Sequence, residues 1–318
     1  MGELQPDSRQ YIAQMLCNIY NEPREVVDII EQSNGQQGCS GSLIGYYSVN
    51  SCDRHGKKHN DIIVTKSAVL FERKVLHLLS SYGCAVPPLI IPDVTNDKRD
   101  LVYMPYLNDR PPLDSGHHDN PLTHSIAEGL AGIHSANMNK QPKWMEKTSD
   151  DYLGRLWLHE WRKQWEINMQ DSEFVREFGA YTNRLETAME QFMHTLDELT
   201  RESKTLTVLN VDLTPAHIRL WQGKACFIDW EQSSYGTLYL DLPNHFNVET
   251  VLAYRDALAR YGHEIPVPEF MERFHEVGRY MGLRYLGVSL WQWAQGGEQR
   301  RQGRWFLYYT LHLALYGR

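Results

Sequence analysis

The 318-residue sequence has few cysteines, and their spacing does not favour pairing. There are five, at Cys17, Cys39, Cys52, Cys84 and Cys226. The number is odd and no two stand in a Cys-x-x-Cys arrangement, so neither a disulfide framework nor a zinc site is indicated. A reducing compartment such as the cytoplasm fits this usage.

Long apolar runs are also missing. The first residues, Met-Gly-Glu-Leu-Gln-Pro-Asp, have neither the basic nor the apolar region of a secretory signal, and no run approaches membrane-spanning length. We see no internal repeat and no low-complexity tract. The sequence therefore predicts a cytoplasmic protein with no membrane partner, long enough to form two lobes.

Basic residues are outnumbered by acidic ones. Lysine and arginine total 32 against 40 aspartates and glutamates, a formal net charge of −8, in a chain that is 42% hydrophobic and 23% charged. This balance argues against nucleic acid as a partner and suits a small cationic substrate. A solvated helical face explains the local acidic cluster better, although the same acids could receive a polyamine: Asp151, Glu160, Glu166, Asp171 and Glu173.

Two aspartates follow strand-like runs near the middle of the chain. Residues 206–209 and 225–228 are β-branched or apolar, with a Gln-Gly-Lys turn signal at 222–224. Asp212 and Asp229 come shortly after these runs. A carboxylate at the end of a buried strand is costly unless it caps a backbone, pairs with a cation or binds a metal. Either aspartate alone is typical of a turn or a helix cap, whereas the two together indicate a metal and proton-transfer site.

A second group of polar residues lies in the N-terminal third. Ser40, Gly41 and Ser42 fall at an expected hairpin turn, where backbone N–H groups can approach phosphate oxygens. Residues 60–66 have a strand pattern that ends in Lys66, and residues 70–79 have a helical pattern that carries Glu72. Singly these are an ordinary hairpin and solvated charges. Their order favours a nucleotide site, in which the glutamate holds the lysine.

The second half of the chain has helical periodicity. Residues 173–202 have the apolar spacing of one long amphipathic helix. Trp157, Trp161 and Trp165 recur every fourth residue, and we expect them in the core. We also expect Trp291 and Trp293 to be core residues.

The central stretch resembles the aminoglycoside phosphotransferase and choline kinase family. That family has a motif close to His-Gly-Asp-Leu-His-Pro-x-Asn-Ile, followed by Ile-Asp-Trp-Glu. Residues 210–218, Asn-Val-Asp-Leu-Thr-Pro-Ala-His-Ile, and residues 228–231, Ile-Asp-Trp-Glu, follow this frame. The resemblance extends from about residue 38 to Asp241.

The resemblance implies roles for the residues of the two motifs. Asp212 would be the base that takes the proton of the acceptor hydroxyl. His217 and Asp229 would bind Mg²⁺, and Lys66 would neutralise the nucleotide phosphates.

The resemblance also implies supporting roles elsewhere. Met104, Pro105 and Tyr106 would form the hinge whose backbone binds the adenine edge. Asp241 would brace the catalytic loop by hydrogen bonds, and His134, near the end of a predicted helix, is more typical of a buried structural histidine than of a catalytic one.

Four positions depart from the family motif. Asn210 and Val211 stand where the family usually has His and Gly, and Thr214 where it often has a second His. His217 stands where Asn normally binds the second metal, and a neutral imidazole suits softer ions than Mg²⁺.

Together these features predict an α+β, protein-kinase-like two-lobe fold. The small β-rich N-lobe would span residues 1–106, and the larger helical C-lobe residues 107–318. The expected activity is transfer of the γ-phosphate of ATP or GTP, with Mg²⁺, to a hydroxyl of a small cationic acceptor such as an aminoglycoside or other antibiotic, by a monomer or homodimer.

Two other functions compete with this prediction. Because the loop is altered, the chain could be a catalytically silent relative that binds a nucleotide or small ligand. A protein kinase is less favoured, since no Ala-Pro-Glu segment follows Asp229.

Overall fold

The computed structural model describes residues 7–37, 41–107, 121–212 and 214–317. Its backbone contacts divide the chain into two compact units: Met1–Leu113 with Ala216–Ser233, and Asp114–Pro215 with Ser234–Arg318. Residues 216–233, which carry His217 and Asp229, thus group with the N-terminal unit. The predicted lobe boundary at residue 106 had assigned them to the C-terminal lobe.

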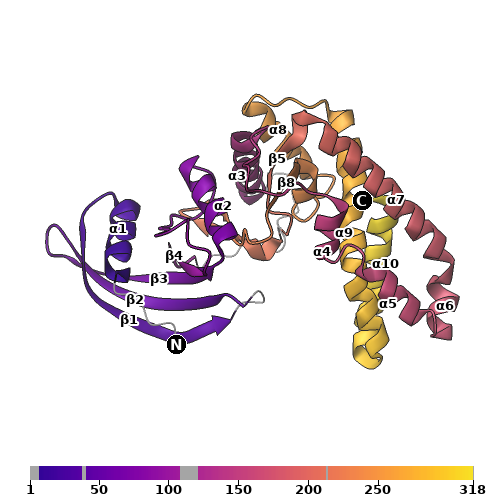
Figure 1. Ribbon diagram of the computed structural model, residues 1–318, viewed down its shortest axis with the longest axis horizontal. Helices are drawn as coiled ribbons and strands as arrows, with labels where there is room; N and C mark the ends of the chain where they lie inside the picture. Colours follow the sequence, from indigo (N-terminus) through magenta and orange to yellow (C-terminus); the bar gives the residue numbers. More distant parts are fainter. Residues whose placement is uncertain (1–6, 38–40, 108–120, 213, 318) are drawn as a thin grey trace. The chain divides into compact units, whose positions relative to one another are not determined.

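The first unit is built on a four-stranded antiparallel sheet (Figure 1). In sheet order its strands are β1 (Arg24–Gln37), β2 (Leu43–Asp53), β3 (Lys58–Ala68) and β4 (Asp100–Pro105). Strand β1 was not predicted, because acidic residues recur at every third position of its first half and interrupt the apolar signal: Glu25, Asp28 and Glu31.

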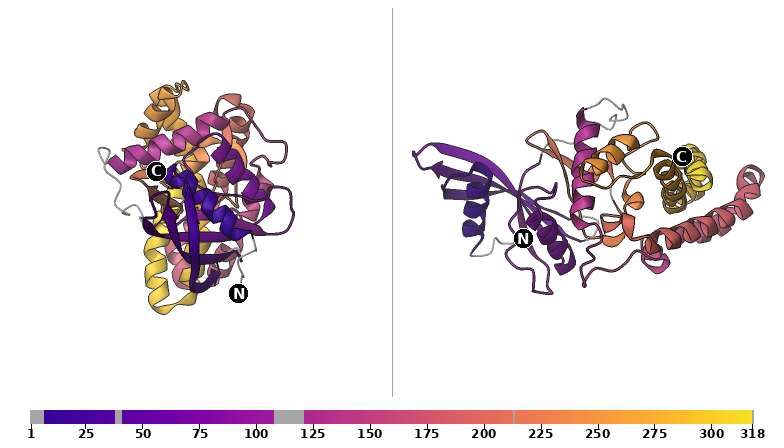
Figure 2. Two further views of the ribbon diagram at one scale, coloured as in Figure 1. Left: turned by 90° about the vertical axis from the view of Figure 1, so that its left-hand side faces the viewer. Right: turned by 90° about the horizontal axis from the view of Figure 1, so that it is seen from above.

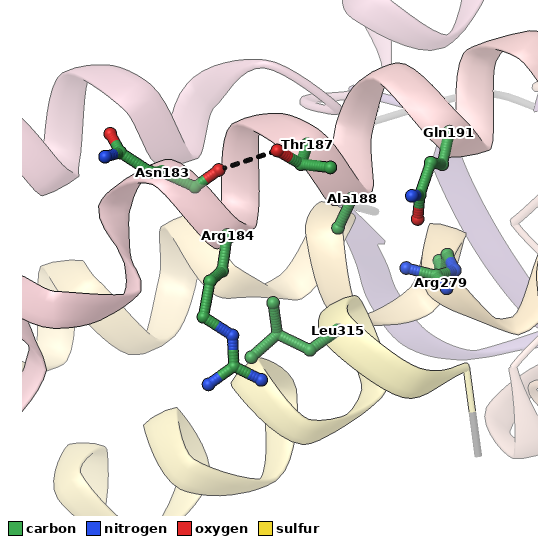
Figure 3. A pocket seen from close by; sticks show the side chains of 7 residues that line it. All are labelled: Asn183, Arg184, Thr187, Ala188, Gln191, Arg279 and Leu315. Atoms are coloured by element: carbon green, nitrogen blue, oxygen red, sulfur yellow. Dashed lines mark hydrogen bonds between the residues drawn. The ribbon is translucent and has the colours of Figure 1, made fainter.

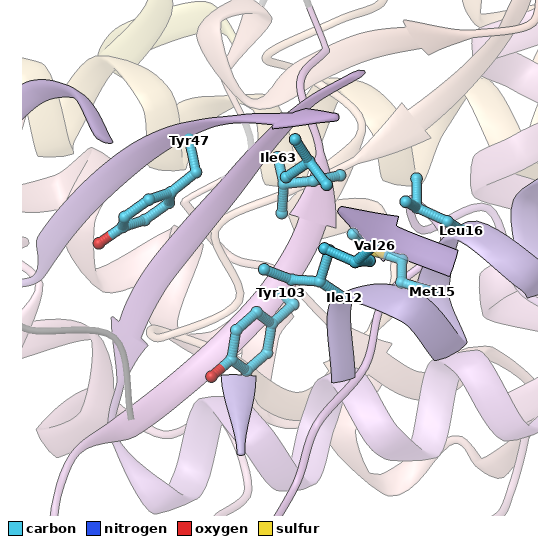
Figure 4. Packing of buried hydrophobic residues seen from close by; sticks show 8 residues of the cluster. Ile12, Met15, Leu16, Val26, Tyr47, Ile63 and Tyr103 are labelled. Carbon is cyan, nitrogen blue, oxygen red and sulfur yellow. The ribbon is translucent and has the colours of Figure 1, made fainter. Parts of the chain in front are cut away.

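Helix α1 (Ser8–Tyr20) packs its apolar face on this sheet. Figure 4 labels most of the resulting core: Ile12, Met15 and Leu16 of the helix with Val26, Tyr47, Ile63 and Tyr103 of the strands. Val49 of β2 belongs to the same cluster. The hydroxyl groups of Ser8 and Tyr103 lie 2.7 Å apart and satisfy each other at the edge of this core. Burial of these eight apolar side chains stabilises the packing of the helix on the sheet.

Three further elements complete the first unit. They are α2 (Leu70–Ser81) and the hairpin of β6 (Ile218–Trp221) and β7 (Lys224–Phe227). The hairpin turn has positive φ at Gln222 (50°) and Gly223 (77°), the conformation of a two-residue hairpin loop. The predicted turn is therefore confirmed.

The second unit is mainly helical. Its helices are α3 (Pro121–Asn137), α4 (Asp150–Arg155), α5 (Glu160–Asn168), α6 (Ser172–Phe178), α7 (Thr182–Arg201), α8 (Val251–Arg260), α9 (Val267–Gln295) and α10 (Gly297–Tyr316). A short sheet pairs β5 (Leu206–Leu209) with β8 (Ser234–Thr237). The predicted strand at 206–209 is confirmed, and so is the α+β class with a small antiparallel sheet and a larger helical part.

Helices α9 and α10 lie side by side (Figures 1 and 2). Gly282 permits this close approach, because a Cβ atom there would stand 2.0 Å from the backbone nitrogen of Ala314. Any other residue at position 282 would force the two helices apart.

Three predictions about the helical part are wrong. A 3₁₀ turn at Gly179–Tyr181 divides the expected single helix into α6 and α7. Trp157 is 60% exposed with φ of 66°, because it lies in the turn between α4 and α5 and so leaves the four-residue spacing. Trp291 is 49% exposed while Trp293 is buried. Side chains of residues two positions apart on a helix point in nearly opposite directions, so only one of these two tryptophans reaches the core.

The sequence predicts neither disulfides nor membrane-spanning segments. No disulfide forms among the described cysteines 17, 52, 84 and 226. Within the described ranges, no helix is both long and apolar enough to cross a membrane.

Candidate active site

Lys66 is the centre of a buried polar cluster in the first unit. It lies on β3, and α2 begins only four residues later at Leu70, so that Glu72 faces back toward the strand. The Lys66 Nζ atom donates to Glu72 Oε1 at 2.6 Å and to Asp229 Oδ1 at 3.0 Å. The Glu72 side chain is 1% exposed and that of Lys66 is 14% exposed. Lys66 of β3, Glu72 of α2 and Asp229 thus meet around one ammonium group. Asp229 lies at least 157 positions further along the chain than the other two.

Burial and charge act in opposite directions in this cluster. Burial raises the pKa of Glu72, and the adjacent Lys66 ammonium only partly offsets this effect. Burial alone would lower the pKa of Lys66, but the carboxylates of Glu72 and Asp229 together raise it. Lys66 is therefore a fixed cation at the end of a strand, which is the property that a phosphate ligand needs.

Asp229 is held in an uncommon backbone conformation. Its φ is 65°, in the left-handed region, and its carboxylate is 44% exposed. The Oδ1 atom accepts from Lys66, and the Oδ2 atom lies 3.5 Å from His217 Nε2. Strained backbone conformations cluster at functional sites, and here the strained residue presents a half-exposed carboxylate.

The donor set here fits Mg²⁺ only in part. Mg²⁺ prefers oxygen ligands, and Asp229 supplies a carboxylate with exposed surface. His217 does not fit, because imidazole suits softer ions and its Nε2 atom faces Asp229. Its Nδ1 atom is buried, with no hydrogen-bond partner among the residues that the structure describes. Over the same residues there is no group of three or more His, Cys, Asp or Glu side chains arranged to hold a metal ion.

The predicted phosphate loop is described only from residue 41. Ser40 lies outside the described residues. Gly41 has φ of 79°, and Ser42 is buried, with its Oγ atom accepting a hydrogen bond from Arg99 at 3.0 Å.

Sequence reasoning missed Arg99, which ties this loop to the rest of the site. Its guanidinium also donates to the backbone oxygen of Ser67 at 3.1 Å and lies 3.4 Å from Glu231 Oε1. Arg99 thus joins the loop, the end of β3 and the Asp-Trp-Glu segment. A basic residue just before a predicted strand was the available signal, but surface arginines are too common for it to have been decisive.

The predicted hinge residues lie at the end of β4. Met104 is opposite Val64 in the β3–β4 ladder, and the Tyr106 N–H donates to Ile62 O at 2.9 Å. Tyr106 is 41% exposed, and its ring packs edge-on against Tyr46 with centroids 5.9 Å apart. The Tyr106 N–H is therefore already engaged within the sheet edge.

Asp212 belongs to the second unit, directly after β5. Its Oδ1 atom accepts a hydrogen bond from Nη2 of Arg284, a residue of α9. The Asp212 side chain is 26% exposed, whereas that of Arg284 is 2% exposed. Sequence reasoning missed Arg284, because it lies 72 positions from Asp212 within a long helix.

Asp241 braces the backbone that leads to Asp212. Its Oδ2 accepts from the Asn210 N–H at 2.9 Å and its Oδ1 from the Val211 N–H at 2.8 Å. His134 Nε2 lies 3.3 Å from Oδ2, and its Nδ1 lies 2.6 Å from the Tyr254 hydroxyl. All of these side chains are buried. The hydrogen bonds predicted for Asp241 are present, and His134 is buried and in contact with two polar partners, as predicted.

We expect Asp241→Asn to destabilise the protein strongly. The amide would replace one acceptor oxygen by a donor, and a buried N–H left without an acceptor costs about 1–3 kcal/mol. Urea unfolding should therefore show a loss of that order or somewhat more. The matched control is Asp197→Asn, which changes an exposed aspartate paired with Arg201 on α7 and should leave stability nearly unchanged. Equal stability of the two variants would contradict the bracing role.

A family comparison identifies the class of protein. A model of the phosphotransferase enzyme family matches residues 57–274, more than half of the chain. The chain belongs to this family. The predicted resemblance is thereby confirmed, and the matched range includes Lys66, Asp212, Asp229 and Asp241.

Solved structures show the fold that this phosphotransferase shares. The amicoumacin kinase hAmiN, in complex with AMP-PNP, Ca²⁺ and Ami, is 11% identical, with 96% of this chain and 94% of that chain covered and a TM-score of 0.56. The choline kinase of Cryptosporidium parvum Iowa II is 12% identical, with 90% and 88% covered and a TM-score of 0.55. The kinase-like fold is therefore confirmed. A search of curated proteins found no match.

The phosphotransferase also has a surface cavity away from the predicted residues. It has a volume of about 290 Å³ and lies among α7, α9 and α10, where Arg184, Gln191 and Arg279 contribute to its lining (Figure 3). None of the site residues predicted from the sequence lines it.

Two of the acids proposed to receive a polyamine have partners in the phosphotransferase. The Arg300 guanidinium pairs with Asp171 at 2.7 Å and with Glu173 at 3.1 Å. An internal cation thus already offsets these two charges.

Proposed function

We propose that this protein transfers the γ-phosphate of ATP or GTP to a hydroxyl group of a small acceptor. Membership of the phosphotransferase enzyme family supports the reaction class. The observation that carries the proposal is the Lys66 ammonium, which is held between Glu72 and Asp229. A lysine fixed in this way neutralises nucleotide phosphates, and phosphoryl transfer depends chiefly on such positioning and charge neutralisation.

The remaining predicted residues have complementary roles in this proposal. Asp212 orients the acceptor hydroxyl and takes its proton, which general-base catalysis requires of a carboxylate within hydrogen-bond reach. Backbone N–H groups of the loop at Gly41 and Ser42 approach the phosphates, and the chain at Met104 and Tyr106 borders the base. Ser40, the other residue predicted for this loop, lies outside the described residues.

Asp229 supplies the carboxylate for Mg²⁺, which would neutralise charge on the phosphates when bound. Of the two residues, His217 is the weaker ligand for Mg²⁺, because an imidazole nitrogen suits softer ions. Its contact with Asp229 supports a second task, which is to orient that carboxylate.

Two observations support the proposed class of acceptor: the net charge of the protein and the names of two structural neighbours. A net charge of −8 favours a cationic molecule. Two neighbours are named as a choline kinase and an amicoumacin kinase, both of which act on small molecules. We therefore propose a cationic antibiotic or amino alcohol as the acceptor, and a role in antibiotic resistance if it is the former.

A second candidate function is nucleotide binding without transfer. The observation in its favour is the incomplete metal site, in which an imidazole stands beside Asp229 and the described residues include no larger cluster of ligating side chains. Such a protein would be stabilised by a nucleotide but would not consume it.

The deciding experiment is phosphate transfer from labelled ATP and GTP, with Mg²⁺ or Mn²⁺, to aminoglycosides, macrolides, other cationic antibiotics and amino alcohols. Transfer to one class would establish the activity and identify the acceptor. Thermal stabilisation by nucleotide without transfer to any acceptor would instead support the silent binder.

A further inference from the structure

Arg284 makes an unusual set of contacts for a helix residue. It lies on α9, almost wholly buried, and its Nη2 donates to Asp212 Oδ1. Its Nη1 donates to the backbone oxygen of Val211 at 3.1 Å and to the Tyr280 hydroxyl at 3.3 Å. One planar group therefore contacts both the side chain of Asp212 and the peptide that precedes it. Only arginine offers two such donor groups in a rigid plane.

Val211 is the residue that needs this support. Its φ is 63°, in the left-handed region, where a β-branched side chain is a marked outlier. Such strain costs on the order of 1–3 kcal/mol and persists only when the surroundings hold it. Asp241 holds the N–H of Val211 at 2.8 Å, and Arg284 holds its carbonyl group at 3.1 Å. The strained peptide is thus fixed at both ends.

We propose that Arg284 is a positioning residue of the phosphotransfer reaction, which holds the strained Val211 peptide and directs the Asp212 carboxylate toward the acceptor. This inference rests on the proposed function of Asp212. Arg284 itself touches no substrate, because its guanidinium is enclosed by Val211, Asp212 and Tyr280.

The burial of Arg284 distinguishes this role from an ordinary ion pair. An ion pair on the surface would contribute little to stability, and its loss would change the mobility of the Asp212 side chain only slightly. Here the ring centroids of Tyr280 and Tyr285 lie 5.9 Å and 5.5 Å from the guanidinium carbon. These rings and the contact with the Val211 carbonyl group hold the guanidinium that donates to Asp212 Oδ1. A displacement of a catalytic group by about 1 Å is enough to reduce a rate by about 100-fold.

The first test separates kcat from KM. Arg284→Met should lower kcat per folded molecule by about 100-fold, while the KM for the nucleotide stays nearly the same, because Lys66 is untouched. Arg284→Lys keeps the charge but lacks the planar fork of donors that reaches Val211 and Asp212 together, so its kcat should fall between those of Arg284→Met and the unchanged protein. Arg273→Met is the matched control: Arg273 is on the same helix and pairs with Glu276 at 3.0 Å, so its kcat should not change.

A second readout does not depend on activity. Hydrogen exchange at the Asn210 and Val211 amides should be about tenfold faster in Arg284→Met, because loss of the carbonyl contact loosens the peptide that Asp241 holds. Exchange in Arg273→Met should match the unchanged protein. If Arg284→Met does not fold, Arg284→Lys replaces it in both measurements.

The outcomes distinguish the two proposals. An active protein whose Arg284 variants keep both kcat and slow exchange at these amides would overturn the positioning role. A protein that phosphorylates no acceptor would overturn the proposed function, and the exchange measurement would still decide whether Arg284 holds Val211. If both Arg284 variants lost stability but kept kcat per folded molecule, Arg284 would be structural only and the inference would be wrong.

Discussion

Asp212→Asn is expected to reduce kcat by about 100- to 10,000-fold, the usual contribution of a general base. Asparagine keeps the shape of the side chain and an oxygen that can accept from Arg284, but it cannot take a proton. Because the hydrogen-bond acceptor is kept although the charge is lost, the variant should lose less stability than Asp212→Ala and, once folded, should still be stabilised by nucleotide. The measurement is steady-state phosphate transfer to the identified acceptor, together with the melting temperature with and without ATP.

The choice of substitution matters because of the buried arginine. Asp212→Ala would leave the guanidinium of Arg284, 2% exposed, without its anionic partner. Breaking a buried ion pair from one side costs about 3–5 kcal/mol, so alanine would confuse loss of chemistry with loss of fold. Asp197→Asn, at an exposed position of α7, is the control for a generic change from aspartate to asparagine. If Asp212→Asn retains the kcat of this control, Asp212 is not the base.

Lys66→Met is expected to affect both nucleotide affinity and stability. Hydrogen bonds to charged groups contribute about 1.5–3 kcal/mol, so affinity for ATP should fall about 10- to 100-fold. The free energy of unfolding should fall by about 3–5 kcal/mol, because the carboxylate of Glu72, 1% exposed, loses its cation. Calorimetric titration with nucleotide and urea unfolding measure the two effects separately.

The stability loss in Lys66→Met should depend on pH in a defined direction. Burial already raises the pKa of Glu72 above its ordinary value of 4.5, and loss of Lys66 would raise it further. An acid whose folded pKa is raised binds more protons in the folded state than in the unfolded state. Its contribution to stability is therefore retained below pH 4.5 and lost as the pH rises through the folded pKa. The variant should lose the most stability, relative to the unchanged protein, at the higher pH.

A double variant separates these effects of Lys66. Lys66→Met/Glu72→Gln removes the buried charge, while an amide oxygen remains for the Trp230 N–H, which lies 3.4 Å from Glu72 Oε1. We expect it to recover much of the lost stability and to lose its pH dependence, yet to bind ATP as weakly as Lys66→Met. Recovery of ATP affinity in the double variant would show that Lys66 only balances Glu72 and does not bind phosphates.

The local signals in the sequence were sufficient for most elements near the site. Apolar β-branched runs before Asp212 and Asp229 correctly predicted β5 and β7, and the Gln-Gly signal correctly predicted the turn that precedes β7, whereas β6 was not predicted. These are signals between neighbours in the chain, which backbone sterics alone can specify. Predictions failed where a helix was interrupted, as at Trp157 and residues 179–181, because a single glycine such as Gly179 is tolerated inside a helix and packing decides whether the helix breaks there.

The sequence by itself determined the family, the α+β class and the identity of the residues at the motif positions, because these are properties of short stretches of chain. The pairing of Glu72 with Lys66 and the bracing by Asp241 were expected from the motifs, but only the tertiary structure decided the other partners. Lys66 also joins Asp229, and Arg284 holds Asp212 across 72 positions. Neither periodicity nor spacing encodes such contacts, since a charge buried on a helix finds its partner only once distant elements pack together and exclude water.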